Sequence, residues 1–577
     1  MASEKITDAT EREHSSANRE KAPAVPSRRG FLLGAGASGL AAAAAGLVAV
    51  QKASAAAPDG TPEQIHLTWG EDPSSEVVVS WASLGQAVNP RVLYGADASL
   101  GKTAHGVLRT YTDGLNGETV FTYHARLHGL KPGSTVRYAV TADNDGNSAQ
   151  PFAASFQTAP RGRVPFRWTS YGDLATPVTA WVLSSPQSRF AVQVVERFQP
   201  LFHLLNGDLC YANLNPTAQP AVWRDFGNNN QTSAANRPWM PCLGNHECEF
   251  NNGEQGFTSY LTRYTLPDNN TDFPGRWYSF RAGSALFISL DADDVIYQDG
   301  AAFVGGPNPL VPAASTGNPA IEPGTSFYIR GYSGGAQTRW LQETLREAAA
   351  DHDIDWIIVQ MHQDALSSSK TGNGSDKGLR EVWLPLFDQY GVDLVLCGHD
   401  HDYERSYPVR GCNHNVGADV ATGAVVDTLQ PNPVVTSDPA NATFDTSRGT
   451  IHLILGGGGT SAPLDVYGVD LANGKTQAKV FTRPNRPVPG SVAGTFVRRA
   501  ADAVEDAIWS ARRDTTGTGY GIAVFDLDPG LAGDQTTITV SYYHAPGADK
   551  TPNADYELFE QIILAKDRRG GDREGRG

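Results

Sequence analysis

The sequence is poor in cysteine and in positive charge. Only 5 of its 577 residues are cysteine, too few for a disulfide scaffold, and the odd number leaves at least one unpaired. There are 46 Lys and Arg against 62 Asp and Glu, a net charge of −16, which argues against a nucleic-acid partner because phosphate backbones demand basic patches. The 60 Gly and 36 Pro stay below the level of low-complexity chains. A chain this long can bury a sizeable core, so global disorder is excluded.

The N-terminal segment is predicted to direct export. Arg28 and Arg29 precede a charge-free, Ala- and Gly-rich stretch from Gly30 to Val50, and Ala53-Ser54-Ala55 has the small-residue pattern of a cleavage site. The segment resembles a twin-arginine signal, read by the twin-arginine translocation machinery. We therefore expect residues 1–55 to be removed and the product, of net charge −18, to be extracellular, periplasmic or cell-wall associated.

A single membrane-spanning helix is the alternative for this stretch, since about 20 residues would span a bilayer. It is disfavoured because Ala and Gly insert poorly and no stop-transfer cluster follows. No stable membrane span is expected after processing.

Residues 61–158 are predicted to form an all-β sandwich. Short alternating segments at 65–69, 77–81, 91–94 and 135–140 are separated by clusters of Gly, Pro, Asn and Asp. Their spacing is typical of a β-sandwich of about 100 residues. The segment resembles a fibronectin type III module, and no chemistry is evident in it.

Residues 163–565 are predicted to form an α/β domain, followed by a solvated tail at 566–577. Strand candidates at 166–171, 201–206, 239–243, 354–361 and 392–397 are interleaved with helical candidates at 190–198, 337–350 and 380–390. Two long Gly- and Pro-rich segments, 291–336 and 409–516, are interpreted as insertions that shape a cleft. Ligands of open α/β sheets collect beyond the carboxyl ends of the strands, so the strand ends are where a site is expected.

Each predicted strand of the α/β domain ends in polar residues that can bind metal ions. Alone, a Gly-Asp pair is usually a turn and a buried His is usually structural. Five successive strand ends that supply hard oxygen and imidazole donors indicate a metal centre instead. The residues are Asp173, Asp208, Tyr211, Asn245, His246, His362, His399 and His401.

These blocks resemble the signature of the purple acid phosphatases, a branch of the dinuclear metallophosphoesterases. The matching motifs are Asp173, Gly207-Asp208-x-x-Tyr211, Gly244-Asn245-His246-Glu247, Val359-x-x-His362 and Gly398-His399-x-His401. The resemblance covers most of the chain, because such family members also carry a fibronectin-like N-terminal module. It implies a multidomain protein whose catalytic domain has two packed β-sheets flanked by helices (α/β/β/α).

The resemblance also implies two metal sites that share a bridging carboxylate, as two ions about 3.5–4 Å apart require. One ion would take Asp173, Asp208, Tyr211 and His401, and the phenolate favours Fe(III). The other would take Asp208, Asn245, His362 and His399, which suit divalent Fe, Zn or Mn. The resulting net charge of about +1 would attract a phosphate despite the acidic surface.

The implied reaction is attack of a metal-bound hydroxide on phosphorus. His246 is not assigned as a ligand, and it is the best candidate to protonate the leaving alcohol or to bind the phosphate beside Asn245. A protonated His246 would favour acid pH.

Two departures from the family pattern concern the site. The family's first motif usually reads Asp-x-Gly, whereas this chain has Ala175, whose methyl group would crowd the backbone. The loop 363–378 contains no His, so substrate preference cannot be transferred from the family, and Lys370 and Lys377 are interpreted as solvated. The run Gly456–Gly459 lacks the Lys of a phosphate-binding loop and is expected to pack closely against other backbone.

The predicted function is an exported acid phosphatase that hydrolyses small phosphate monoesters. A phosphodiesterase or nucleotidase on the same dinuclear site is the alternative within enzymes. A surface binding protein with a vestigial metal site is the alternative from another class, although no donor is missing. A metal-dependent protein phosphatase would have no use for Tyr211. Disulfide pairing among Cys210, Cys242, Cys248 and Cys397, oligomeric state and natural substrate stay open.

Overall fold

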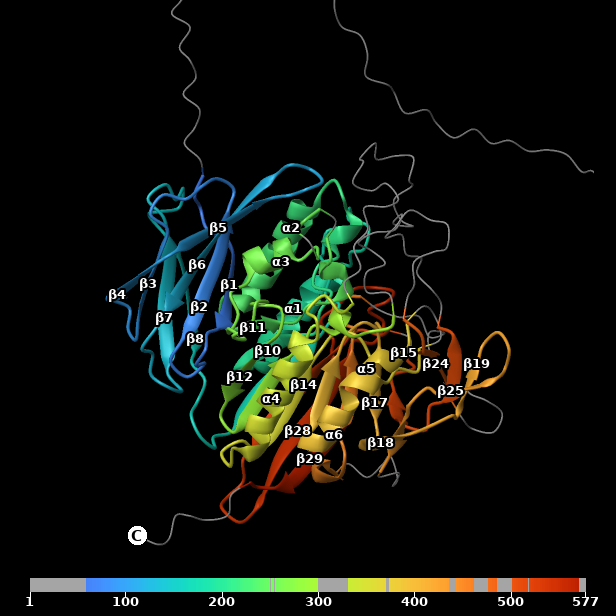
Figure 1. Cartoon of the computed structure of the whole chain (residues 1–577). Helices are drawn as coiled ribbons and strands as arrows, with labels where there is room; N and C mark the ends of the chain where they lie inside the picture. Colours follow the sequence, from blue (N-terminus) through green and yellow to red (C-terminus); the bar gives the residue numbers. More distant parts are fainter. Residues whose placement is uncertain are drawn as a thin grey trace, which may run out of the picture. The chain divides into compact units, whose positions relative to one another are not determined.

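The computed structural model describes residues 59–249, 251–253, 255–298, 330–369, 373–434, 443–460, 476–484, 501–516 and 518–569 (Figure 1). All of these residues belong to one compact unit. The predicted signal lies outside the described residues. Within them, no helix is both long and apolar enough to cross a membrane.

The N-terminal domain is a sandwich of two antiparallel four-stranded sheets, as predicted. Inward-facing residues alternate along its strands, as Val136, Tyr138 and Val140 do, so the two sheets share one core. The first sheet is β1 (Glu63–Trp69), β2 (Val77–Ser83), β6 (Thr119–Leu127) and β5 (Val107–Thr112), and the second is β4 (Lys102–His105), β3 (Arg91–Gly95), β7 (Thr135–Thr141) and β8 (Phe152–Gln157).

The α/β domain, predicted to be the catalytic domain, contains two seven-stranded sheets. The first has the order β11 (Trp239–Pro241), β10 (Phe202–Leu205), β9 (Phe166–Tyr171), β27 (Gly521–Asp528), β28 (Gln535–His544), β29 (Glu557–Asp567) and β22 (Thr443–Asp445). The second has the order β12 (Tyr278–Ala282), β13 (Ala285–Ser289), β14 (Trp356–Gln360), β16 (Leu394–Cys397), β23 (Ile451–Leu455), β17 (Tyr403–Ser406) and β26 (Ser510–Arg513). Strands β9–β11 run parallel in the first sheet, and β13, β14, β16 and β23 run parallel in the second.

An aromatic layer holds the two sheets face to face. Trp168 and Phe202 of the first sheet contact Phe287 of the second, with ring centroids 5.2 and 5.0 Å apart. In β14, Ile358 belongs to this inter-sheet core, whereas Ile357 and Val359 belong to a second core. Because side chains alternate along a strand, the second sheet is buried on both faces.

Helices cover the outer faces of the sheets, which completes the α/β/β/α layering predicted from the resemblance. Leu341, Leu345 and Phe387 of the helices α4 and α6 form the second core with β14 and β16, and Figure 1 shows α4 and α6 next to β14. Helix α1 contacts β27 of the first sheet, and α2 lies against α1 and β1. The helices are α1 (Gln187–Phe198), α2 (Gln219–Ala234), α3 (Thr258–Arg263), α4 (Ala336–Ala350), α5 (Lys377–Val382) and α6 (Leu384–Tyr390), with short 3-10 turns η1 (Ala212–Leu214), η2 (Asn245–Glu247), η3 (Ala292–Asp294) and η6 (Thr446–Arg448).

The structure differs from the sequence-based expectations in three places, which are the helix at 380–390, the C-terminal tail and the segment 409–516. The single helix expected at 380–390 is two helices that meet at Trp383, because Pro385 has no N–H for the carbonyl of Glu381. Lys566, expected to begin a solvated tail, instead lies in β29 and binds the buried carboxylate of Asp393 at 2.7 Å.

The segment 409–516, interpreted as an insertion, supplies β23 and β26 to the second sheet. It also forms most of two small sheets. These are β15 (Ser375–Asp376), β24 (Gln477–Phe481), β25 (Ala503–Asp506), β19 (Gly417–Asp419) and β20 (Val425–Val426), and the pair β18 (Val409–Asn413) and β21 (Gln430–Pro433).

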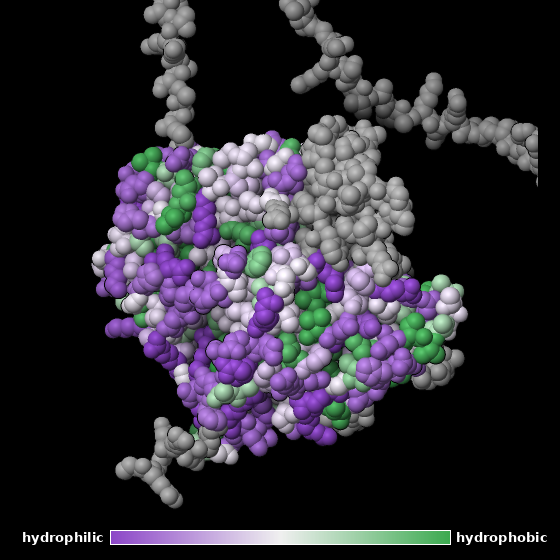
Figure 2. Space-filling view, in the orientation of Figure 1, coloured by the Kyte–Doolittle hydropathy of each residue, from purple (hydrophilic) through white to green (hydrophobic). Residues whose placement is uncertain are grey.

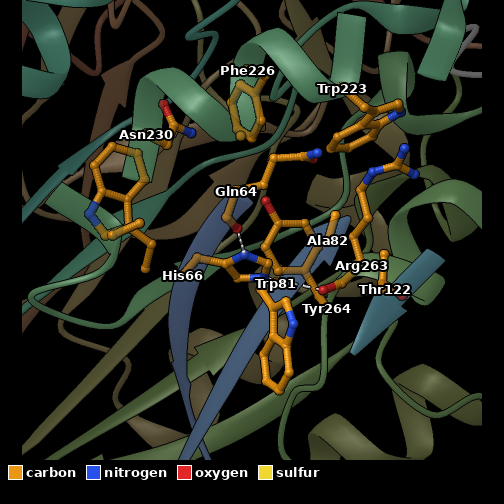
Figure 3. Close-up of a pocket in the computed structure, with 13 residues that line it drawn as sticks. Gln64, His66, Trp81, Ala82, Thr122, Trp223, Phe226, Asn230, Arg263 and Tyr264 are labelled. Carbon is orange, nitrogen blue, oxygen red and sulfur yellow. Dashed lines mark hydrogen bonds between the residues drawn. The ribbon is translucent and has the colours of Figure 1, made fainter. Parts of the chain in front are cut away.

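The sandwich and the catalytic domain share a buried contact. The Tyr138 hydroxyl donates to the carbonyl of Ala235 at 2.7 Å. Figure 3 shows the small cavity that remains in this contact, which is lined by Trp81 of the sandwich and by Phe226 and Arg263 of the α/β domain. Its volume of about 30 Å³ is far below the several hundred Å³ of a ligand pocket, so the contact is structural. The visible face of the molecule is mostly hydrophilic (Figure 2).

Candidate metal centre

The predicted donor residues follow strand ends of both sheets. Asp173 and Asp208 follow β9 and β10 of the first sheet, while His362 and His399 follow β14 and β16 of the second. Packing the sheets face to face brings these carboxyl ends to the same end of the domain. The site is therefore built from both halves of the catalytic domain.

The chain leaves these strands in sharp turns. Asp173, Asp208, Tyr211 and His399 all have positive φ angles, of 59°, 49°, 59° and 67°. Residues other than glycine seldom adopt this left-handed conformation, and such strain clusters at functional sites.

Asp173, Tyr211 and His401 form what we call the first pocket. The Tyr211 hydroxyl donates to the Asp173 carboxylate at 2.9 Å and lies 3.1 Å from His401 Nε2. That nitrogen is 3.3 Å from Asp173 Oδ1. One oxygen from each of Asp173 and Tyr211 and one imidazole nitrogen thus converge, which are three of the four donors predicted for the phenolate-containing set.

Asp208, Asn245, His362 and His399 form the second pocket. His362 Nε2 lies 3.1 Å from both Asp208 Oδ2 and Asn245 Oδ1, and 3.2 Å from His399 Nδ1. Asp208, His362 and His399 each offer a ligand atom within 4.8 Å of the others. All seven predicted donors therefore lie in one of two pockets.

The chemistry of these donors fits bound cations. Burial raises the pKa of Tyr211 well above its usual value, and the Asp173 and Asp208 carboxylates raise it further. Burial also raises the pKa of Asp173. For Asp208, burial acts in the same direction, but the charges of His362 and His246 outweigh it and lower the pKa. A site that gathers this much potential negative charge out of solvent needs positive charge, which bound metal ions would supply.

His246 stands beside the second pocket. Its Nε2 lies 3.8 Å from Asp208 Oδ2, and its ring packs on that of Tyr211 with centroids 4.5 Å apart. Its Nδ1 is 2.9 Å from the side-chain oxygen of Asn213. This bond points Nε2 towards the centre, which is the arrangement a proton donor needs. Asn213 was not identified from the sequence.

Glu247 ties two of the site loops together. Its buried carboxylate accepts hydrogen bonds from the backbone N–H groups of Asp208 at 2.9 Å, Leu209 at 2.8 Å and Gly244 at 2.8 Å. The sequence analysis included Glu247 in a motif without a role. Its function here is to fix the loops that carry Asp208 and Asn245.

The glycine run after β23 packs against the loop of Asp173, as expected. Gly459 and Thr460 both donate their N–H groups to the Asp173 carbonyl at 3.0 Å. Ala175, the departure from the family pattern, has φ 59° and is fully buried with Tyr211 and Leu214. A glycine would adopt this conformation without strain, and the methyl group of Ala175 instead packs beside Tyr211.

The loop 363–378 is tied down by its own polar contacts where it is described. Gln363 donates to Asp293 at 2.6 Å, and the Ser368 N–H donates to Glu404 at 3.0 Å. Asn373 donates to the carbonyl of His399 at 2.9 Å. Lys370 lies outside the described residues, and Lys377 begins α5.

All five cysteines are free thiols, and Cys210, Cys242, Cys248 and Cys397 are buried. The Cys248 thiol donates to Asp293 at 3.4 Å. The open question of disulfide pairing is thus answered by buried thiols rather than by bridges.

Comparison with known families finds two matches along the chain. Residues 62–158 match the family model described as "Purple acid Phosphatase, N-terminal domain". Residues 185–403 match the model described as "Calcineurin-like phosphoesterase". The two matches follow the order of the sandwich and the catalytic domain.

Similar proteins come from bacteria and plants. The uncharacterized protein Rv2577 of Mycobacterium tuberculosis is 42% identical over 525 residues, which cover 88% of this chain and 87% of the relative. A purple acid phosphatase of Glycine max is 27% identical over 363 residues, 62% of this chain and 68% of the relative. The solved structure of purple acid phosphatase PPD1 from yellow lupin has a TM-score of 0.56 at 18% identity, covering 88% of this chain and 75% of that one, a likeness of fold.

Proposed function

The chain belongs to the purple acid phosphatase family, and on this basis we propose that it is an exported phosphatase that hydrolyses small phosphate monoesters at acid pH. Membership implies a dinuclear metal site. The observation that supports the proposal is the convergence of seven donor side chains into two adjoining pockets, with Tyr211 in the first. A vestigial centre would have lost donors, and this one has kept them all.

The chain's own residues would hold two ions in these pockets. Asp208, whose Oδ2 faces the second pocket, is proposed as the bridging ligand, with Fe(III) in the first pocket and divalent Fe, Zn or Mn in the second. When bound, the two ions would supply the activated nucleophile and offset the charge of the phosphoryl group.

His246 is proposed to hold the proton that the leaving alcohol receives. The amide oxygen of Asn213 accepts the Nδ1–H at 2.9 Å, which leaves Nε2 directed to the substrate side of Asp208. Loss of one general acid typically costs 10²–10⁴-fold in rate.

The His246→Ala variant tests this role. We expect turnover of an alkyl phosphate, a poor leaving group, to fall by about 10²-fold or more and turnover of a nitrophenyl phosphate to fall much less. The exposed His414 provides the control, His414→Ala. Equal losses on both substrates would contradict the assignment of His246 as the acid.

Metal analysis combined with a visible spectrum tests the centre itself. We expect two ions per chain, one of them iron, and a visible absorption band from the Tyr211 phenolate on Fe(III). Tyr211→Phe should abolish the band, whereas Tyr94→Phe in the sandwich should keep it. A protein that binds no metal would refute the proposed function.

Steady-state rates on a monoester and on a diester analogue test the reaction. The proposal expects a higher kcat/KM for the monoester, with a maximum at acid pH. Preference for the diester would identify a phosphodiesterase on the same donors.

Export is proposed from the paired arginines Arg28 and Arg29. Cells that express the full chain should release the processed protein outside the cytoplasmic membrane. The Arg28→Lys, Arg29→Lys double variant should retain it inside, and equal export of both proteins would contradict the twin-arginine assignment.

A further inference from the structure

The two histidines of the second pocket present different ring nitrogens to it. His362 Nδ1 lies 2.8 Å from the backbone carbonyl of Asn206, so Nε2 faces Asp208 and Asn245. His399 is reversed, because its Nδ1 faces His362 and its Nε2 is hydrogen-bonded to the side-chain oxygen of Gln298. An imidazole that gives one nitrogen to a metal keeps its proton on the other, and the partner of that proton fixes the ring.

Gln298 is held in place for this contact. Its backbone N–H and that of Tyr297 both donate to the buried carboxylate of Asp376, the latter at 2.9 Å. Asp376 also caps α5 through the N–H of Gly378 at 2.7 Å. The side chain of Gln298 is 5% exposed, and within the described residues its Nε2 has no hydrogen-bond partner. The amide oxygen is thus the end of the Gln298 side chain that makes a hydrogen bond, and its partner is His399.

The geometry points to Gln298 as a positioning residue that sets the tautomer and the orientation of His399. In this role it controls the metal affinity of the second pocket without touching the ion. The two histidines differ in one testable respect. The partner of His362 is main chain and survives any side-chain substitution, whereas the partner of His399 is a side chain. The inference rests on the proposed function, since it assumes that the second pocket binds a metal ion.

The test uses the full chain and the variants Gln298→Met and Gln298→Glu. Methionine has a similar length but cannot accept the His399 Nε2–H, whereas glutamate keeps an acceptor oxygen. A matched control is Gln187→Met, which changes a glutamine that is also buried but binds Asn553 and Tyr556. Each protein is equilibrated with a graded chelator, and bound ions are counted by elemental analysis.

The inference expects Gln298→Met to lose the divalent ion at a 10- to 100-fold lower chelator concentration, the usual effect of removing a partner of a metal-binding histidine. The visible band of the first pocket should persist, because Tyr211 and His401 are unchanged. Gln298→Glu and Gln187→Met should retain both ions as the wild type does.

Equal retention of the divalent ion by wild type and Gln298→Met would overturn the inference and leave the proposed function intact. A wild type without bound metal would instead refute the proposed function. If Gln298→Met does not fold, the Gln298→Glu variant decides. A folded Gln298→Glu protein that binds the divalent ion more weakly than the wild type, despite its acceptor oxygen, overturns the inference. Binding of the divalent ion as tight as in the wild type, or tighter, supports it.

Discussion

Glu247 shows how much of the centre depends on a single side chain that touches no predicted ligand atom. Its carboxylate accepts three backbone N–H groups from two loops. Burial, and then the charge of Asp208, raise its pKa well above the usual value. The loops would separate if this acceptor were lost.

Glu247→Gln should destabilise the protein by about 2–4 kcal/mol, because a buried donor left without an acceptor costs roughly 1–3 kcal/mol and the glutamine NH₂ group faces donors. Urea unfolding of the metal-free protein measures this cost. Glu347→Gln on α4, where the side chain is 68% exposed, is the control. The interpretation fails if both substitutions cost the same.

The sequence predicted the residues that cluster at the strand ends better than the residues that orient them. Asp173, Asp208 and His362 follow apolar runs within recognisable motifs, so their clustering could be predicted. Asn213 and Gln298 act through contacts with His246 and His399 that only the folded chain creates. Gln298 in particular lies in a segment interpreted as an insertion, with no pattern to distinguish it from other polar loop residues.

At the scale of elements, the loop after β23 supports the loop after β9. A Cβ on Gly459 would lie 1.7 Å from the carbonyl oxygen of Leu174, a distance at which backbone must move. We expect Gly459→Ala to cost about 1–3 kcal/mol and to weaken metal retention in the first pocket, since Asp173 would shift. Thermal unfolding and metal analysis measure the two effects.

Gly101→Ala is the matched control for this substitution, because the nearest atom to its Cβ would be 3.9 Å away, on a Ser99 side chain. Unchanged metal retention in Gly459→Ala, with the fold intact, would show that the glycine contact does not position Asp173.

One strand was predicted to the residue, whereas one expected helix proved to be two. The expected strand 166–171 coincides with β9, since its apolar run is bounded by Pro165 and Gly172. The expected helix 380–390 instead splits at Trp383. The apolar periodicity continues across the break and therefore predicts a single helix. The helix is nevertheless interrupted, because Pro385 has no N–H to continue its hydrogen bonds. The role of β23 in the middle of a sheet was not predicted, because pairing with β16 and β17 depends on distant residues.

At the scale of the whole molecule, each domain contains a buried histidine that resists protonation. Burial lowers the pKa of His124 in the sandwich to about 3, helped by Arg109, and lowers that of His452 in the catalytic domain to about 3, helped by Arg380. Neither ring nitrogen of His452 has a hydrogen-bond partner within the described residues. Both histidine side chains are therefore neutral in the folded protein.

Stability should consequently fall with acidification. A histidine whose pKa is lower in the folded protein than in the unfolded chain adds to the free energy of unfolding. This stabilisation is complete above the unfolded pKa of about 6.5 and is lost as pH falls towards about 3. We expect the free energy of unfolding to decrease by a few kcal/mol across this window. His452→Leu should flatten the dependence measured by urea unfolding between pH 7 and 4.

The exposed His352 supplies a control, as His352→Leu should leave the slope unchanged. A slope in His452→Leu that equals the wild-type slope would contradict this prediction. An enzyme that works at acid pH would thus operate where its own fold is weaker.

Strand β9, which leads to Asp173, pairs on one side with β10 and on the other with β27 (Gly521–Asp528). A ribosome therefore synthesises almost the whole polypeptide before the edge of β9 receives its second neighbour. Until then the nascent chain presents that edge unpaired, and the first pocket has no rigid wall. If the first pocket binds an ion, as proposed, that ion would be captured only after almost the whole chain has been made, so the metals available where folding finishes would decide which ion it holds.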